Sequence, residues 1–187
     1  MFAAAHSALA LPSLKRHLAR GAAPEPRWYR LAYNLLSLAL FAWAMAAWRS
    51  SQVLYFVPGI MSLALYALQA VLMAALYSCV RQTGIGYFLG TSQLRNDTAM
   101  HPRLVTGGWY AISRHPLYLH SLLFMILSPV MTAQWLALTI FSAIYFIAGA
   151  LVEEKRLLRE FGGEYIQYRQ RVPFLIPLPG RVRPPSS

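Results

Sequence analysis

Residues 117–152 read LYLHSLLFMILSPVMTAQWLALTIFSAIYFIAGALV, and this stretch decides the fold. Its 36 residues include no Asp, Glu, Lys or Arg. A helix that crosses a membrane needs about 20 apolar residues, because it rises 1.5 Å per residue through a core about 30 Å thick. The stretch therefore holds one full crossing and a second, shorter segment, with a break at Ser128-Pro129. We expect a broken or re-entrant helix, whose unpaired backbone groups must face protein or water rather than lipid.

Two other apolar blocks, Trp28–Trp48 and Val53–Tyr77, precede this stretch, and Arg30 is their one charged residue. Charged residues make up 12% of the 187 residues, against roughly 25% in an average soluble domain. The sequence therefore predicts an all-α fold, a polytopic membrane helical bundle with about four transmembrane segments, one of them short or broken. Cys79 is the single cysteine, which excludes an internal disulfide and a zinc site built on paired cysteines. We expect no bound metal.

The net charge of +11 would suit nucleic acid in a soluble protein, but the positions of the basic residues indicate a membrane topology instead. Basic residues accumulate on the cytoplasmic side of membrane proteins. Arg49 falls on one side of the expected helices and the other 16 of the 17 basic residues fall on the opposite side. These 16 are Lys15, Arg16, Arg20, Arg27, Arg30, Arg81, Arg95, Arg103, Arg114, Lys155, Arg156, Arg159, Arg169, Arg171, Arg181 and Arg183. We therefore expect that side to face the cytoplasm, with anionic lipid as its partner.

Arg114 and His115 directly precede Pro116, which suits the first turn of a helix because its missing N–H would be unpaired there anyway. The N-terminal end of a helix attracts anions through its free N–H groups and its dipole. A carboxylate or phosphate bound there could form two parallel hydrogen bonds with Arg114. The alternative is that Arg114 and His115 only anchor the helix at the lipid headgroups.

Glu153 and Glu154 form the one acidic pair in the chain, directly after the long apolar stretch. Acidic residues at a membrane boundary need a partner, and either a cationic ligand or Arg114 would serve. The alternative is a surface pair such as Glu153 with Arg156, which is common and contributes only about 0.3–0.5 kcal/mol.

The segment that follows the last apolar helix reads FGGEYIQYR, residues 161–169. We expect its two glycines to break that helix and a short amphipathic helix to follow. Tyr165 and Tyr168 then share a face of the short helix. Anchoring at the membrane surface is the default interpretation for at least one of these tyrosines.

Four motifs follow one another within residues 84–177. They are LVTGGWY at 104–110, Arg114-His115-Pro116-x-Tyr118 before a helical hairpin, Glu153-Glu154-x-x-Leu157, and Phe161-Gly162-x-x-Tyr165-x-x-Tyr168. In this order the motifs resemble the isoprenylcysteine carboxyl methyltransferase superfamily, integral-membrane enzymes that depend on S-adenosylmethionine. The resemblance implies a single methyltransferase domain over residues 1–187, with residues 84–177 as its cofactor-binding core.

The superfamily holds its cofactor with the loop before the broken helix, the Arg-His-Pro motif and the glutamate pair. Carried over to this chain, the cofactor-binding residues are Gln93, Leu104, Val105, Tyr110, Arg114, His115, Tyr118, Glu153 and Glu154. S-adenosylmethionine offers a carboxylate for Arg114, an ammonium and a sulfonium for the glutamates, and an adenine for aromatic and apolar contacts. The catalytic candidates are Arg169 and Arg114, which could stabilise an anionic acceptor, and His115 as a less favoured base.

Two stretches, Ser128–Thr132 and the ending Arg171–Pro177, are similar to particular bacterial members of the superfamily. These members are related to methanethiol S-methyltransferase and to the nitrite/nitric-oxide-associated membrane proteins. The similarity implies a bacterial inner-membrane protein whose acceptor is a small or lipophilic thiol. Residues 5–16 resemble the end of a first transmembrane helix in those relatives. We therefore expect residues 1–27 to form a cytoplasmic segment or a truncated helix, and residues 178–187 a flexible tail.

Three alternatives to thiol methylation stay open: methylation of a prenylcysteine carboxylate, methylation of a phospholipid amine, and a membrane protein without turnover. In the last alternative the chain binds a ligand or assembles with other helices, and its polar cluster joins helices to one another. The ordered set of Arg114, His115, Tyr118, Glu153 and Glu154 favours an enzyme, since contacts between helices rarely need that combination.

Overall fold

The computed structural model describes residues 28–47, 51–86 and 103–177. The expected segment 1–27, the tail 178–187 and Gln93 lie outside these ranges. Contacts divide the chain into two compact units, Met1–Ser50 with Thr83–Pro102 and Ser51–Gln82 with Arg103–Ser187. In the first unit, α3 (Tyr29–Ala47) is a helix of 19 residues at the position of the first expected crossing. The candidate site lies in the second unit.

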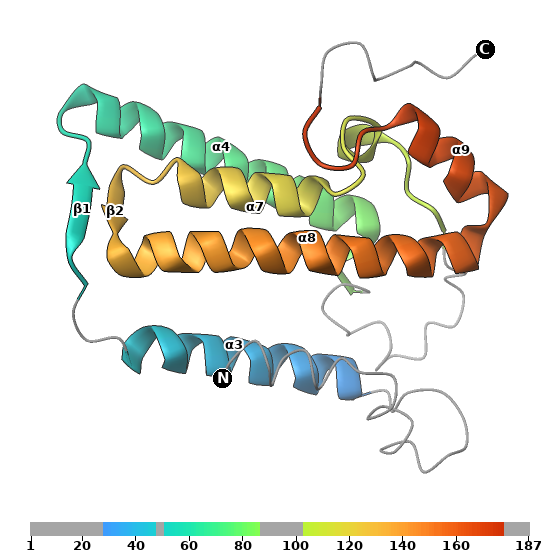
Figure 1. Ribbon diagram of the computed structural model, residues 1–187, viewed down its shortest axis with the longest axis horizontal. Coiled ribbons are helices and arrows are strands. Elements are labelled where there is room, and N and C mark those ends of the chain that lie inside the picture. The colour runs from blue at the N-terminus through green and yellow to red at the C-terminus, as the bar shows by residue number, and fades with distance from the viewer. Residues whose placement is uncertain (1–27, 48–50, 87–102, 178–187) are drawn as a thin grey trace. The chain divides into compact units, whose positions relative to one another are not determined.

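The second unit contains three long or medium helices, a two-stranded sheet and two short helices. In chain order its elements are β1 (Val53–Phe56), α4 (Ile60–Thr83), the 3-10 helix η1 (Gly108–Ala111), α7 (Pro116–Ile126), β2 (Val130–Thr132), α8 (Ala133–Phe161) and α9 (Gly163–Arg171). α4, α7 and α8 run alongside one another, and β1 pairs with β2 at one end of them (Figure 1). α9 and η1 lie together at the other end, which is where the candidate site residues gather.

The break predicted at Ser128-Pro129 is confirmed, because α7 ends at Ile126 and α8 begins at Ala133. α7 has only 11 residues, which is too short for a membrane crossing. Thr132 caps α8 by accepting a hydrogen bond from Trp135 N at 3.1 Å. The indole of Trp135 donates in turn to Met125 O, near the end of α7, at 2.9 Å. These backbone groups at the break are thus bonded to protein, as an apolar surrounding requires.

The described residues are mostly helical, as an all-α fold predicts, but the start of the second apolar block is a strand. Val53–Tyr77 is predicted as one crossing, but its first residues form β1 and the helix begins only at Ile60. Pro58 and Gly59 separate the two, and Gly59 turns the chain with φ at +64°. The strand is completed by pairing with β2, in which Val53 lies opposite Thr132, Tyr55 opposite Met131 and Phe56 opposite Val130. Hydropathy alone does not reveal this pairing, because a short apolar strand and the first turn of an apolar helix have the same composition.

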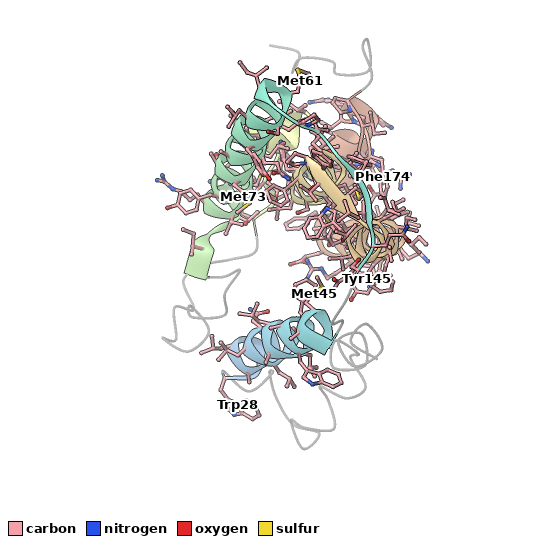
Figure 2. The ribbon with its side chains drawn as sticks, turned by 90° about the vertical axis from the view of Figure 1, so that its left-hand side faces the viewer. Trp28, Met45, Met61, Met73, Tyr145 and Phe174 are labelled. Carbon is pink, nitrogen blue, oxygen red and sulfur yellow. The ribbon has the colours of Figure 1, made fainter. Side chains whose placement is uncertain are left out.

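α4 and α8 are the two helices in the described part of the chain that are long and apolar enough to cross a membrane. Their large apolar side chains are mostly exposed, and Ile60 on α4 and Ile144 on α8 are 79% and 66% exposed. Figure 2 shows such side chains standing out along α4, among them Met61 and Met73. Soluble monomers rarely expose apolar surface of this extent, so these helices fit a lipid environment.

Gly162 joins α8 to α9 at φ +51° and ψ −120°, a backbone conformation that residues with a Cβ rarely adopt. We expect Gly162→Ala to lower the free energy of unfolding by about 1–3 kcal/mol through backbone strain. Thermal unfolding of the detergent-solubilised protein measures the loss. Gly163→Ala is the matched control, because both added Cβ atoms meet nothing within 4 Å but Gly163 has no positive φ. Equal losses in the two variants would contradict strain as the cause.

Candidate functional site

The loop before α7 ends in η1, which packs against the end of α4. Gly108 begins η1 with φ at +60°, and a Cβ there would lie 2.5 Å from Gln82 Nε2. The positive φ therefore favours glycine, and the Gln82 side chain on α4 would have to move to admit a Cβ. The indole of Trp109 meets the ring of His120 edge-on, with 4.7 Å between the ring centroids. The loop predicted to bind the cofactor is thus held against both α4 and α7.

Arg114 lies at the start of α7, where Pro116 is the first helical residue as predicted. Its Nε donates to Glu154 Oε1 at 2.7 Å, and both side chains are only 11% exposed. Its Nη1 donates to the carbonyl oxygens of Arg169, at 3.0 Å, and Val172, at 2.8 Å. One guanidinium therefore joins the start of α7, the C-terminal half of α8 and the end of α9.

His115 is buried beside both glutamates. Its Nε2 lies 3.4 Å from Glu154 Oε1, and its Nδ1 lies 3.9 Å from Glu153 Oε2. The imidazole ring stacks on Tyr118, with 5.7 Å between ring centroids. Burial lowers the pKa of His115 below its ordinary value of 6.5, although the two carboxylates act in the opposite direction. The imidazole is therefore neutral near pH 7, where it can act as a base.

The two glutamates have different environments. Glu153 is more exposed than Glu154, and it lies 3.7 Å from Arg156 Nη2 while accepting a hydrogen bond from the Tyr118 hydroxyl at 3.4 Å. The sequence left two alternatives for the acidic pair, a contact with Arg114 and a surface pair with Arg156, and each glutamate adopts one of them. Glu154 pairs with Arg114 across the fold, and Glu153 forms the surface pair with Arg156.

Tyr165 and Tyr168 on α9 are buried, so the interpretation of either as a membrane-surface anchor is wrong. Tyr168 donates from its hydroxyl to Tyr110 O at 2.7 Å. The two tyrosines and Val172 form an apolar cluster against which Leu104 packs. The turn at Gly162 redirects the chain after α8, and this face of α9 then covers the loop before α7 rather than lipid.

The predicted site residues fall into three groups. The structure brings five into one cluster, which we call the Arg–Glu cluster: Arg114, His115, Tyr118, Glu153 and Glu154. Leu104 and Tyr110 contact α9 beside it, and Val105 is partly buried next to Leu104. Arg169 is exposed and contributes its carbonyl oxygen to Arg114, while Gln93 lies outside the described ranges.

Phe174 and Tyr165 belong to the same region, although the sequence does not assign either to the site. The Phe174 ring lies 5.6 Å from the Arg114 guanidinium and meets the His115 ring edge-on, with 5.0 Å between centroids. Figure 2 marks Phe174 in the segment that follows α9. Its backbone neighbour Pro173 accepts a hydrogen bond from Arg114 N at 3.0 Å. In the sequence, the apolar run VPFLIP at 172–177 indicates that Phe174 packs against protein or lipid. It does not indicate which helix or loop Phe174 contacts.

The Arg–Glu cluster offers the groups that recognise an amino-acid zwitterion. Arg114 and the start of α7 suit a carboxylate, and the two glutamates suit an ammonium. Within residues 28–47, 51–86 and 103–177, no group of three or more His, Cys, Asp or Glu could hold a metal ion. Its arginine and its two glutamates make the cluster a candidate for binding a charged organic ligand.

Comparison with known proteins assigns the chain to a family. The family model described as phospholipid methyltransferase matches residues 57–164, more than half of the chain. The chain belongs to this phospholipid methyltransferase family. The match runs from the residue after β1 through α8 to the start of α9 and contains all five residues of the Arg–Glu cluster.

Curated relatives share the same region. Methanethiol S-methyltransferase 1 of Bradyrhizobium diazoefficiens is 41% identical over 87 residues, which cover 46% of this chain and 30% of the relative. Methanethiol S-methyltransferase of Crocosphaera subtropica is 37% identical over 76 residues, 41% of this chain and 30% of the relative. Protein-S-isoprenylcysteine O-methyltransferase B of Arabidopsis thaliana is 35% identical over 80 residues, 41% of each chain. These relatives confirm the superfamily inferred from the motifs.

The matched region spans less than a third of the length of the two methanethiol S-methyltransferases. No solved structure matches this chain.

Proposed function

We propose that this chain is a membrane methyltransferase that binds S-adenosylmethionine at the Arg–Glu cluster and methylates a small or lipophilic thiol. The observation that carries the proposal is the buried pair of Arg114 and Glu154, which lie 40 positions apart in the sequence. Desolvation offsets most of what a buried ion pair contributes to stability, so such a pair is better explained by a ligand that carries both charges. The names of the relatives support methyl transfer as the reaction class.

The residues of the cluster fit the charged end of S-adenosylmethionine. Arg114 and the N–H groups at the start of α7 would hold its carboxylate, and Glu153 and Glu154 its ammonium. The tyrosines and the apolar residues of the loop would contact its adenine, with Gln93 as a further proposed contact. When bound, S-adenosylmethionine supplies a methyl group activated by a positively charged sulfur.

The chain's own contribution to methyl transfer would be alignment and exclusion of water. The opposite charges of a thiolate and a sulfonium merge in the transition state, so water, which stabilises the separated ions, slows the step. The thiolate must be held in line at about 3–3.5 Å from the methyl group. Arg169 is the better of the two proposed arginines for stabilising a thiolate, because Arg114 is the one proposed to hold the carboxylate of the cofactor. Neutral His115 is the proposed base.

The proposed location is a bacterial inner membrane, with about four transmembrane segments and the cofactor site facing the cytoplasm. The distribution of basic residues supports this orientation, since Lys155, Arg156 and Arg159 lie on α8 directly after the two glutamates. S-adenosylmethionine would then enter from the cytoplasm, and a lipophilic thiol would arrive laterally from the bilayer.

An acceptor screen with tritiated S-adenosylmethionine and the purified protein in detergent tests the proposal. We expect label on alkyl or aryl thiols, at a rate that rises about tenfold per pH unit below the acceptor's pKa, because the thiolate is the nucleophile. A membrane preparation from cells without the chain is the control. Label found only on a prenylcysteine carboxylate or on phosphatidylethanolamine would contradict a thiol as the methyl acceptor and identify that compound as the acceptor instead. Failure to bind S-adenosylmethionine in calorimetry would contradict the proposed cofactor and the enzyme class with it.

A further inference from the structure

Tyr165 carries an unpartnered hydroxyl inside the protein. Among the described residues its oxygen is the one fully buried side-chain oxygen or nitrogen without a hydrogen-bond partner. The side chain is 0% exposed. Phenylalanine would fill nearly the same space without burying a polar group, so packing alone does not account for a tyrosine.

Tyr168, one turn further along α9, shows how the fold treats a hydroxyl that has a structural role. It is also buried, and its hydroxyl donates to Tyr110 O at 2.7 Å. The two tyrosines share a helix face and their rings lie 5.9 Å apart. The Tyr168 hydroxyl therefore serves the fold, while the Tyr165 hydroxyl has no partner in hydrogen-bond geometry and the Glu154 carboxylate is its charged neighbour.

The surroundings of Tyr165 place its hydroxyl at the Arg–Glu cluster. Burial raises the pKa of Tyr165, the negative charge of Glu154 and the approach of the Tyr165 hydroxyl to its carboxylate raise it further, and the positive charge of Arg114 acts against them. The phenol is thus protonated at neutral pH and is available as a hydrogen-bond donor. Glu154 Oε1 is already engaged by Arg114 and His115, which leaves Oε2 for a ligand or for a rotated Tyr165.

We propose that the Tyr165 hydroxyl is a ligand contact that donates a hydrogen bond to the carboxylate at the amino-acid end of the methyl donor. This rests on the proposed function, because it needs S-adenosylmethionine at the Arg–Glu cluster. A protonated phenol donates readily, and of the two charged groups at that end only the carboxylate accepts. The competing explanation is structural: Tyr165 rotates slightly, donates to Glu154 and only positions it.

Calorimetry on the full chain in detergent separates these explanations by comparing S-adenosylmethionine with decarboxylated S-adenosylmethionine, which keeps the ammonium but lacks the carboxylate. We expect Tyr165→Phe to weaken binding of S-adenosylmethionine about ten- to a hundredfold, as for a lost hydrogen bond to a charged group. Binding of the decarboxylated compound should not change, because its missing carboxylate has no contact to lose.

Thermal unfolding of the ligand-free variants provides the matched control. Tyr165→Phe should unfold at the same temperature as the wild type or higher, whereas Tyr168→Phe should unfold at a lower temperature because Tyr110 O loses its donor. A lower unfolding temperature for Tyr165→Phe, an equal loss of affinity for both compounds, or no loss for either would overturn the inference. A wild-type chain that binds neither compound would instead overturn the proposed function, and this inference with it.

Discussion

Arg114→Ala is expected to lower the free energy of unfolding by about 3–5 kcal/mol, the largest stability effect predicted for this chain. The substitution leaves the Glu154 carboxylate, which is only 11% exposed, without its charged partner. It also removes the donor of two backbone carbonyls, those of Arg169 and Val172. Because these contacts join α7, α8 and α9, we expect binding of S-adenosylmethionine to fall by at least ten- to a hundredfold.

Two further variants keep the Arg114 prediction testable if Arg114→Ala does not fold. Arg114→Lys retains the positive charge but loses the planar fork that reaches Glu154 and the carbonyls together, so we expect intermediate losses of stability and affinity. Arg114→Ala combined with Glu154→Gln no longer buries an unpaired charge and should recover part of the stability. Unfolding in detergent and calorimetry measure both quantities. Wild-type stability in Arg114→Ala would show that the pair and the carbonyl bonds contribute nothing.

Glu154→Gln is expected to weaken binding of S-adenosylmethionine about ten- to a hundredfold. It should also lower the free energy of unfolding, because the buried Arg114 loses its charged partner, but by less than Arg114→Ala does. The glutamine oxygen can still accept a hydrogen bond from Arg114 Nε, so the contact between α7 and α8 survives. What the substitution removes is the negative charge proposed to hold the ligand's ammonium. Calorimetry reports the affinity, and thermal unfolding shows whether the fold is retained.

Glu153→Gln is the matched comparison for Glu154→Gln, because it removes the more exposed of the two charges proposed to hold the ammonium. The Glu153 carboxylate is 37% exposed and its Arg156 partner lies 3.7 Å away on the surface, so its charge is screened by water. We expect a loss of affinity no greater than about fivefold, the upper range for an exposed ion pair. Equal losses in the two variants would mean that the buried position of Glu154 has no special role in binding.

Much of the chain's organisation could be predicted because it depends on local steric and solvation effects. Pro116 begins α7 and Ser128-Pro129 separates it from α8, since proline limits where a helix can start and continue. Gly162 ends α8 because it adopts a positive φ that other residues avoid. The motifs also led to the five residues that meet in the Arg–Glu cluster, through a resemblance that the family match confirms.

Other features depend on residues far apart in the sequence, and their local patterns are ambiguous. Residues 53–56 form a strand only because β2 is available to pair with them. The tyrosines of α9 have the spacing of membrane anchors, yet the turn after α8 buries both. Which glutamate pairs with Arg114 is also decided across the fold, because adjacent residues on a helix point in directions about 100° apart.

Hydropathy, proline and glycine in the sequence thus set the main helices and the breaks between them, because each acts within a few residues. Tertiary packing decided which partner each polar group at the start of α7, on α8 and on α9 would contact. It placed Arg114 against Glu154 and two carbonyls, Phe174 against His115, and the buried Tyr165 hydroxyl near Glu154 but outside hydrogen-bond geometry. The physical reason is that a buried polar group must find its partner among whatever the fold brings near it, and that choice is not encoded in the spacing of any one segment.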